Sequence, residues 1–382
     1  MLAAVPLFVF MGTMLERSGI ADRLFDALHL WTRRLPGGLA VGTVLMCVIF
    51  AASSGVVGAT ETVVGLLATP AMMRYKYDKG LIAGAICAGG SLGTIIPPSV
   101  VVVIMGPVAN VSVGDLLVGM VFPALILASS YLLYIVGRCT LDPAAGPRLP
   151  RSADEPPLST RLRLTATALL PPLLLIFAVL GSIMLGLAAR TEAAALGAAG
   201  AVALTAFYRA FSLAALQEAL MRTLAITAMI MAIVLGGSLM SGAFVGAGGI
   251  AVTQDLVNTL GLGTAGLVAV VLAIAFVAGF FLDWISIVLI LLPIFTPLLQ
   301  GMGVDMVWFC ILLLIVIQTS YLTPPMAPAL FYFRAISPPE ITTIDMYRGG
   351  IPFIILHFIP FAIVLAFPDT VLWLPRALFA VD

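Results

Sequence analysis

Long apolar segments, separated by short polar or glycine-rich stretches, follow one another along almost the whole chain. A run of about 20 apolar residues is long enough to cross a bilayer as a helix. Uninterrupted spans are predicted at 116–136, 165–188, 192–208, 223–247 and 350–367. The hydrophobic pattern therefore predicts an all-α polytopic membrane protein.

Two shorter stretches, 20–34 and 250–260, have a different pattern. In the first, Ile20, Leu24 and Leu28 recur at helical spacing, and charged residues occupy another face. This arrangement is typical of an amphipathic helix that lies along the membrane surface.

Four apolar segments are interrupted near their middle. Two are long enough to enter the membrane and return to the same side as re-entrant helical hairpins. Two others are helices broken by a proline pair, which removes backbone hydrogen-bond donors. The hairpins are predicted at 39–73, with the tip at Ser53-Ser54-Gly55, and at 265–300, with the tip near Asp283; the broken helices are predicted at 81–105, broken at Pro97-Pro98, and at 306–333, broken at Pro324-Pro325.

Matching residues recur at a constant spacing, which indicates a duplicated unit. The pairs 227 residues apart are Pro70 and Pro297, Asp78 and Asp305, Pro97 and Pro324, and Pro98 and Pro325; those 230 apart are Gly19 and Gly249, Asp115 and Asp345, and Gly119 and Gly349. We predict a first repeat unit at 1–137, a cytoplasmic linker at 138–164 and a second unit at 165–382. The first unit lacks counterparts for 165–222, so we expect roughly 60 residues and about two spans to be missing from its N-terminal side.

The distribution of basic residues orients the two units. If both hairpins return to the side that they entered from, one side of the membrane receives 16 of the 18 Lys and Arg residues, in 17–36, 74–79, 138–163, 209–222 and 334–348. The other side receives only Arg190 and Arg376. Because cytoplasmic loops carry the excess of Lys and Arg, the first side is predicted to be cytoplasmic. The hairpins then enter from opposite sides, and the two units form an inverted repeat.

Composition excludes several classes of protein. The chain is 62% hydrophobic and 9% charged, whereas soluble domains are roughly 25% charged. The 18 Lys plus Arg balance 18 Asp plus Glu, which argues against nucleic acid as a partner. Four scattered Cys and two isolated His form no metal-binding or redox spacing. Phosphate-binding and hydrolytic motifs are also missing from the sequence, so we predict no enzyme activity and no organic cofactor.

The interruptions predict a binding site near the membrane midplane. Unwound backbone survives at that depth only inside protein or around a polar cavity, and paired interruptions in inverted halves are typical of transport sites. Hydroxyl and carbonyl oxygens there suit a hard cation such as Na⁺ rather than zinc or copper. The candidates are Ser53, Ser54 and Gly55 at the first tip, Gly93, Thr94, Ile96 and Ser99 at the first break, and Gln318, Thr319, Ser320, Thr323 and Met326 at the second.

Acidic residues near the tips have two interpretations. A carboxylate inside an apolar hairpin is costly, which makes Asp283 a functional candidate. Alternatively, Asp283 only caps backbone N–H groups at the tip. Glu61, just past the first tip, is similarly ambiguous.

Several strings of residues resemble the large membrane subunit of tripartite ATP-independent periplasmic (TRAP) transporters. They are FAASSG at 50–55, YDKG at 77–80, LGTIIPPS at 92–99, SVGDL at 112–116, FLD at 281–283, LPIFTP at 292–297, TPP at 323–325 and IPF at 351–353. The strings QTSYLTPP at 318–325 and ALFY at 329–332 resemble the branch labelled mannitol/chloroaromatic. Many members of the family carry Gly where this chain has Ser320.

The resemblance implies a multi-pass protein of the bacterial inner membrane, in the elevator-type ion transporter superfamily. Such a carrier takes up a small organic anion, a carboxylate, together with Na⁺. The implied partners are a periplasmic substrate-binding protein and a small four-helix membrane subunit. Two alternatives remain: a stand-alone sodium- or proton-coupled carrier of the same superfamily, and a membrane scaffold protein without transport.

The resemblance also assigns roles to the candidate residues. On the family pattern, Ser54, Gly93, Ile96 and Ser99 hold one Na⁺, and Ser320, Thr323 and Met326 hold another. The candidates for substrate binding are Ser53, Gly55, Thr94, Asp283, Gln318 and Thr319.

Overall fold

The computed structural model describes residues 3–54, 57–149 and 157–379, and every regular element in these ranges is a helix. In chain order the helices are α1 (Ala4–Glu16), α2 (Ile20–Thr32), α3 (Gly38–Ser54), α4 (Val57–Arg74), α5 (Lys79–Ser91), the 3-10 turn η1 (Leu92–Thr94), α6 (Val100–Ala109), α7 (Val113–Gly119), α8 (Val121–Leu141), α9 (Leu158–Met184), α10 (Arg190–Phe207), α11 (Leu213–Gly246), α12 (Gly249–Thr259), α13 (Thr264–Ala278), α14 (Trp284–Gly301), α15 (Met306–Leu322), α16 (Pro328–Ile336), α17 (Thr343–Ala366) and α18 (Asp369–Phe379). Five helical segments in these ranges are long and apolar enough to cross a membrane. The predicted all-α polytopic fold is confirmed.

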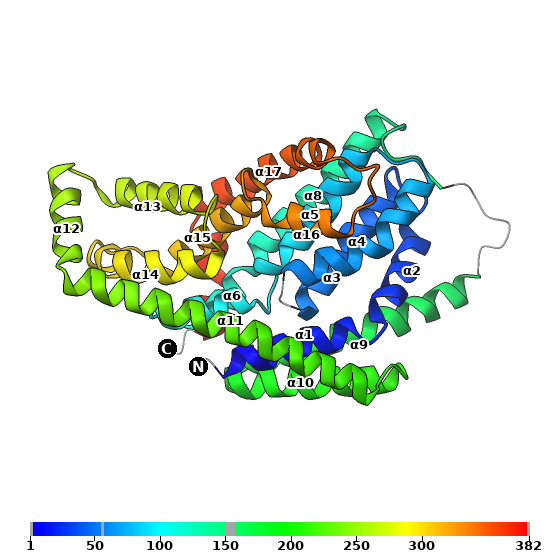
Figure 1. The fold of residues 1–382 in the computed structure, drawn as a ribbon, viewed down its shortest axis with the longest axis horizontal. Helices are drawn as coiled ribbons and strands as arrows, with labels where there is room; N and C mark the ends of the chain where they lie inside the picture. Colours follow the sequence, from blue (N-terminus) through cyan, green and yellow to red (C-terminus); the bar gives the residue numbers. More distant parts are fainter. Residues whose placement is uncertain (1–2, 55–56, 150–156, 380–382) are drawn as a thin grey trace.

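Both predicted hairpins are present. Helix α3 packs against α4, and α13 packs against α14. The two hairpins reach the middle of the molecule from opposite ends of its long axis (Figure 1). The amphipathic helices α2 and α12 that precede them also stand at opposite ends, as the repeat predicts.

Both predicted broken helices are present as well. Helix α5 ends at Ser91, and after η1 the chain is not helical again until α6 begins at Val100. Helix α15 ends at Leu322, and α16 begins at Pro328. Each gap contains its Pro-Pro pair, and both of these peptide bonds are cis.

Several residues that mark the repeat cap corresponding helices. The Asp78 carboxylate accepts a 2.9 Å hydrogen bond from the backbone at the start of α5, and Asp305 accepts one of 2.9 Å at the start of α15. Ser112 and Thr342 cap α7 and α17 in the same way. A side chain at the N-cap satisfies backbone donors that the helix itself cannot pair. The duplicated positions are therefore the points where equivalent helices begin.

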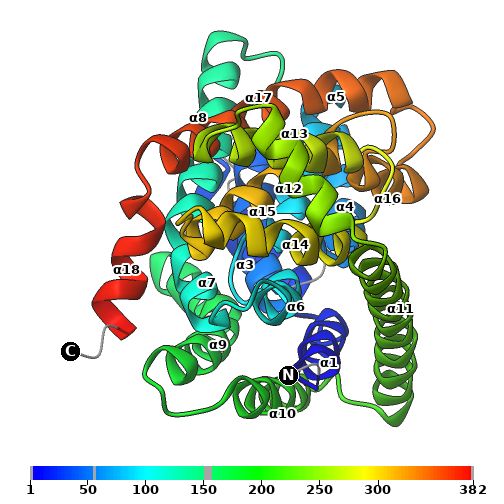
Figure 2. The same cartoon turned by 90° about the vertical axis from the view of Figure 1, so that its left-hand side faces the viewer.

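The helices form two groups. Helices α1, α9, α10 and α11 lie together along one side of the molecule, with α1 packed against α10 and α11 (Figure 2). The hairpins, the broken helices and α17 form the larger body above them (Figure 1). Because α11 packs against α14, and α1 against α3 and α6, the first group faces both hairpins.

Helices α5 and α17 approach each other very closely. A Cβ added at Gly349 would lie 1.9 Å from the carbonyl oxygen of Gly80, and one added at Gly84 would lie 2.3 Å from the carbonyl oxygen of Gly349. Only glycine allows two backbones to come so near. Since α5 belongs to the first repeat and α17 to the second, the two repeats interlock.

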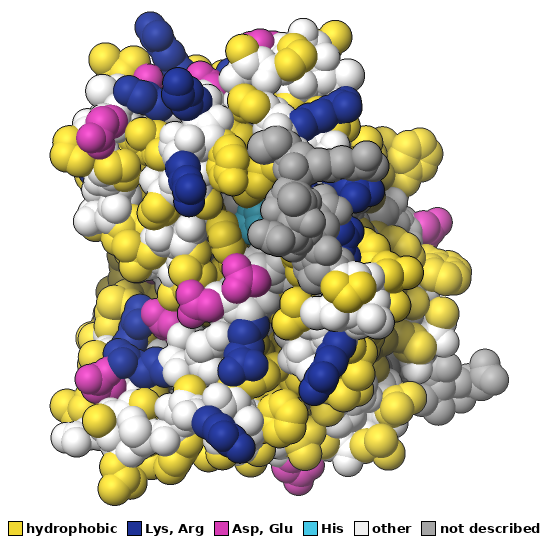
Figure 3. Space-filling model, turned by 90° about the vertical axis from the view of Figure 1, so that its right-hand side faces the viewer, with side chains coloured by type: hydrophobic (Ala, Val, Ile, Leu, Met, Phe, Trp, Pro, Cys, Tyr) yellow, Lys and Arg dark blue, Asp and Glu magenta, His cyan; other side chains and the backbone are white. Residues whose placement is uncertain are grey.

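The stretches predicted to share one side of the membrane meet at one end of the molecule. The backbone N–H of Gly37 donates to Gly146 at 3.0 Å, and that of Asp78 donates to Ala145 at 2.9 Å. Arg138 donates to the Asp78 carboxylate at 3.1 Å. Lys and Arg side chains gather over this end (Figure 3), in agreement with the predicted asymmetry of charge.

Two boundaries differ from the prediction. The stretches 209–222 and 223–247 form one helix, α11, because no Pro or turn separates them and Ser212 caps its start. The predicted linker at 138–164 is shorter, since α8 continues to Leu141 and α9 begins at Leu158. Arginine near a helix C-terminus is favourable, which explains why α8 continues through Arg138.

Candidate functional site

One cavity of about 320 Å³ lies where the two hairpins meet the α1–α11 face. It is bounded by α1, α4, α6, α11, the start of α14, the end of α15 and α16. Its lining therefore includes the neighbourhood of both tips and both breaks. The lining side chains with polar groups are Thr62, Arg222, Asp283, Trp284, Tyr321 and Tyr332.

Arg222 places a positive charge at this cavity. Its Nη1 atom donates to both carboxylate oxygens of Glu16, at 2.8 and 2.9 Å. A second ion pair, between Arg17 and Glu218, joins the same two helices away from the cavity lining. The Arg222 side chain is 41% exposed and has five N–H donors, so it can donate to a bound anion while it keeps Glu16.

Asp283 lies at the tip of the second hairpin. Its Oδ2 atom accepts a 3.1 Å hydrogen bond from the backbone N–H of Ile285, so the capping interpretation is correct for this oxygen. The carboxylate also lines the cavity and interacts with the hydroxyl of Tyr321. Asp283 can therefore cap α14 and contact a ligand at the same time.

The first break brings four predicted residues together in a buried segment. The Ser99 hydroxyl donates to the backbone carbonyl of Thr94 at 2.8 Å, and so spans the break. The Thr94 hydroxyl donates to a carbonyl one turn back at 2.9 Å. Gly93 and Ile96 lie in the same segment, and both residues are buried.

The second break touches the tip of the second hairpin. The Ser320 hydroxyl donates to a carbonyl of its own helix at 2.6 Å, and the Thr323 hydroxyl donates to the Thr319 carbonyl at 2.8 Å. A Cβ added at Gly279 would lie 2.3 Å from the Ser320 hydroxyl oxygen, so the Ser320 side chain packs closely against the backbone at Gly279. Met326 is 46% exposed, and only its backbone carbonyl has an oxygen to offer a cation.

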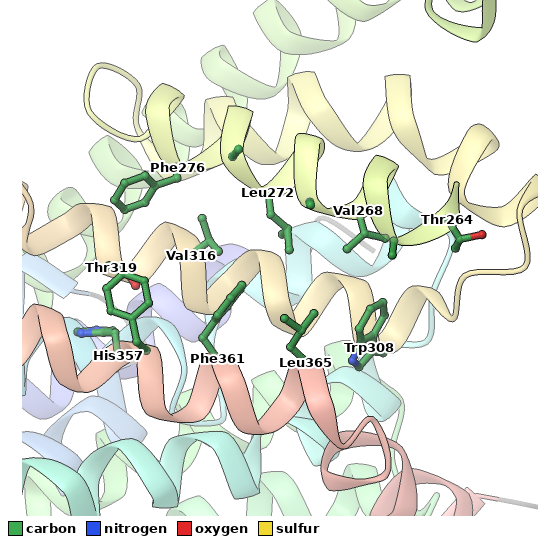
Figure 4. Close-up of a pocket in the computed structure, with 14 residues that line it drawn as sticks. Thr264, Val268, Leu272, Phe276, Trp308, Val316, Thr319, His357, Phe361 and Leu365 are labelled. Carbon is green, nitrogen blue, oxygen red and sulfur yellow. The ribbon is translucent and has the colours of Figure 1, made fainter. Parts of the chain in front are cut away.

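Among the candidates that the structure describes, Asp283 is the only one in the lining of this cavity. Thr319 instead lines a separate apolar groove of about 820 Å³ between α13, α15 and α17 (Figure 4). The Ser53 hydroxyl donates to a carbonyl of its own helix at 2.8 Å. Gln318 is fully buried, and neither atom of its amide has a partner among the described residues. The side chain of Ser54 and the whole of Gly55 lie outside the described residues.

Five of the polar residues that line the cavity were not predicted from the sequence: Thr62, Arg222, Trp284, Tyr321 and Tyr332. The distribution of basic residues places Arg222 in the stretch 209–222, which is predicted to be cytoplasmic, and so does not mark it as a site residue. The two tyrosines stand in the strings that carry the family resemblance, and that placement is the signal that could have identified them.

Glu61 on α4 is the other polar residue that the structure makes conspicuous. Its side chain is fully buried, and neither carboxylate oxygen has a hydrogen-bond partner among the described residues. The sequence left the role of Glu61 open, and the structure shows that protein encloses its side chain.

The oxygen atoms at the breaks fit a hard monovalent cation. Hydroxyl groups and unwound backbone carbonyls are uncharged oxygen donors, which suit Na⁺. Within the described ranges, no three His, Cys, Asp or Glu side chains are grouped to hold a metal ion. The kind of donor present at the breaks therefore fits the predicted ion.

Residues 1–370 match the model of the family described as the tripartite ATP-independent periplasmic transporter, DctM component. The chain belongs to this family. It is 32% identical to the C4-dicarboxylate TRAP transporter large permease protein DctM of Pseudomonas aeruginosa, over 98% of this chain and 86% of that relative. It is 29% identical to the ectoine TRAP transporter large permease protein TeaC of Halomonas elongata, over 98% and 86%. It is 25% identical to the sialic acid TRAP transporter permease protein SiaT of Haemophilus influenzae, over 99% and 60%.

The fold is also shared with a solved structure. The YdaH transporter of Alcanivorax borkumensis superposes with a TM-score of 0.56, at 14% identity, over 97% of this chain and 86% of that one. As a member of the TRAP large permease family, the protein is a transporter of the inner membrane and not an enzyme, as predicted. The three relatives carry dicarboxylate, ectoine and sialic acid in their names, and they do not support the mannitol/chloroaromatic branch.

Proposed function

We propose that the cavity between the hairpin tips binds a small organic anion, which this permease imports together with Na⁺. One observation supports this more than any other: Arg222 and residues that neighbour both tips and both breaks line a single volume. At about 320 Å³ that volume lies near the lower end of the range for ligand sites, roughly 300–1,000 Å³. A small substrate is therefore favoured.

The chemistry of the lining favours a carboxylate that also carries a hydrogen-bond donor. Arg222 presents a planar fork that matches a carboxylate. Asp283, across the cavity, repels a second carboxylate but accepts hydrogen bonds from a hydroxyl or ammonium group. Tyr321 and Tyr332 add hydroxyl groups, and Trp284 adds an apolar face.

Two Na⁺ sites at the breaks would couple ion binding to substrate binding. Gly93, Ile96 and Ser99 would hold one ion together with Ser54, and Ser320, Thr323 and the Met326 carbonyl would hold the other. Hydrogen bonds within each break, such as Ser99 to Thr94, keep these oxygens close together. Na⁺ at either break would order the adjacent tip and so complete the cavity.

Movement of one helical group against the other would carry the cavity across the membrane. Helices α1, α10 and α11 would stay in place, and the hairpins and broken helices would slide past them as an elevator-type body in which α4 and α16 can still separate. The basic end of the molecule would face the cytoplasm. Membership of the family implies a periplasmic binding protein and a small membrane subunit as partners.

Uptake into proteoliposomes tests this proposal. The permease is reconstituted with its small subunit, and a binding protein delivers labelled C4-dicarboxylate, ectoine or sialic acid under a Na⁺ or a K⁺ gradient. We expect Na⁺-dependent uptake of one of these carboxylates. We expect Arg222→Gln to abolish uptake, since it removes the cavity's anchor for an anion.

Arg17→Gln is the matched control. It also breaks an ion pair between α1 and α11, but Arg17 does not line the cavity. We expect Arg17→Gln to keep most of the wild-type uptake. Equal loss in both variants would show that Arg222 acts only by joining the two helices, and would contradict its role in substrate binding.

A further inference from the structure

Glu61 is an uncompensated acid in the middle of the first hairpin. Its side chain is fully buried in α4, and neither carboxylate oxygen accepts a hydrogen bond from any described residue. An ionised carboxylate without a partner is very costly in a medium of low polarity. Such a group either binds a cation or stays neutral by keeping a proton.

The surroundings of Glu61 hold weak acids and no basic group. A Cβ added at Gly90 of α5 would lie 2.4 Å from Cγ and Cδ of Glu61, so the acid packs directly on this helix. The titratable groups that interact with it are Cys47 of α3, Cys87 of α5, Tyr321 of α15 and Tyr332 of α16. All four are neutral when protonated, so none can balance a negative charge.

The other elements packed on α4 do not supply a balancing charge either. The turn η1 (Leu92–Thr94) has no titratable side chain. His29 of α2 lies against Gly42, near the base of the hairpin, and Arg334 of α16 donates to the carbonyl of Ile341. Among the described residues, the carboxyl of Glu61 therefore has only neutral neighbours.

Glu61 is close to the cavity but covered. Gly58 and Thr62, which flank it on α4, both line the cavity. The ring of Tyr332 lies over Gly58, where an added Cβ would be 2.9 Å away, and the Tyr332 hydroxyl interacts with both Glu61 and Asp283. Tyr332 itself lines the cavity and packs on the turn of α4 that precedes Glu61, so movement of α16 relative to α4 would open this part of α4 to the cavity.

We propose that Glu61 is a proton-binding site carried by the first hairpin, in addition to the Na⁺ sites. In the present conformation the carboxyl is neutral. When α16 and α4 separate, the O–H bond of the carboxyl breaks and a water molecule in the cavity accepts the proton. Return to the buried conformation requires the proton to bind again, so the conformational cycle depends on pH.

This proposal rests on the proposed transport function. Two measurements distinguish a failure of the proton site from a failure of the transport function. The first is infrared spectroscopy of the purified permease with its small subunit, which reports protonation whether or not the complex transports. We expect a carboxylic-acid C=O band at neutral pH that shifts in D₂O and disappears in Glu61→Gln. It should persist in Glu340→Gln, which removes an exposed glutamate of the same charge.

The second measurement is the pH profile of uptake in proteoliposomes. Wild type and Glu340→Gln should lose activity at alkaline pH, by about tenfold for each pH unit once the carboxyl has titrated. Glu61→Gln, which is neutral and of the same shape, should lose that dependence. An infrared band that is absent at neutral pH, or a Glu61→Gln profile that follows wild type, overturns the proposal. Absence of all uptake by wild type would instead contradict the transport function, and the infrared result would still decide the state of Glu61.

Discussion

The contact between Gly279 and Ser320 offers a sharp test of how the second hairpin meets the second break. Gly279 has a helical backbone (φ −64°, ψ −12°), so alanine is allowed there by conformation. Its Cβ would, however, lie 2.3 Å from the Ser320 hydroxyl oxygen and 2.5 Å from the Ser320 Cβ. Ordinary contacts begin near 3.4 Å, so the tip and α15 must separate by about 1 Å.

The expected cost follows from this overlap. Overpacking of a buried contact typically destabilises by about 1–3 kcal/mol. Ser320→Gly alone should cost about 0.5–1 kcal/mol, because glycine weakens a helix interior. If Gly279→Ala and Ser320→Gly acted independently, the double variant would lose folding stability equal to the sum of the two single losses. Since Ser320→Gly removes both clashing atoms, we instead expect Gly279→Ala with Ser320→Gly to be about as stable as Ser320→Gly alone.

Thermal unfolding of the purified protein in detergent, monitored by tryptophan fluorescence, measures the stability of each variant. A loss of 1 kcal/mol corresponds to roughly 2–4 °C of melting temperature for chains of 150–250 residues. Gly236→Ala is the matched control, because a Cβ there meets nothing within 4 Å. A double variant whose loss equals the sum of the single losses would refute the reasoning, and so would a Gly279→Ala variant as stable as Gly236→Ala.

Three other predictions follow from the fold and the proposed sites. Gly349→Ala would put a Cβ 1.9 Å from the Gly80 carbonyl oxygen. Because a backbone atom cannot rotate away as a side chain can, we expect a loss of folding stability at or above the upper end of the roughly 1–3 kcal/mol typical of overpacking. An unchanged melting temperature would contradict this. Burial raises the pKa of Tyr77 to about 12, so the folded state keeps a proton that the unfolded state loses above about pH 10. The contribution of this proton to folding stability should therefore be fully present below that pH and be lost as the pH rises toward 12. Measured by denaturant unfolding, the free energy of unfolding of Tyr77→Phe should fall less between these pH values than that of wild type. An equal fall in both proteins would contradict the raised pKa of Tyr77. NaCl at about 100 times the Kd should stabilise wild type by about 2.7 kcal/mol relative to KCl at equal ionic strength, and Ser99→Ala and Thr323→Ala should reduce this rise. Variants that keep the full Na⁺-specific rise would contradict the ion sites.

The breaks and hairpins could be predicted from the sequence because they depend on local chemistry. The proline pairs at 97–98 and 324–325 lie where a helix ends, although the pair at 171–172 lies inside α9. Residues such as Asp78 and Asp305 cap the helices that follow them. Their constant spacing revealed the repeat without any knowledge of packing. The first break is the clearest case, since Ser99 and Thr94 are close in sequence and also bond to each other.

The cavity could not be predicted in the same way, because its residues come from distant segments. Arg222 and Tyr332 are 110 residues apart and belong to different helical groups. Their meeting depends on how α11 and α16 pack around the tips, and no periodicity reports this. The rotation of a helix is also decisive: Thr319 and Tyr321 are two positions apart, yet Thr319 lines the apolar groove and Tyr321 lines the cavity.

The glycine contact between α5 and α17 has a consequence for how the chain is made. Gly80 precedes Gly349 by 269 residues, so α5 enters the membrane long before its partner leaves the ribosome. Until α17 arrives, the glycine-lined face of α5 must be covered by lipid or by the insertion machinery. The first repeat cannot complete its packing as an autonomous folding unit, and its final assembly has to wait until α17 has been synthesised.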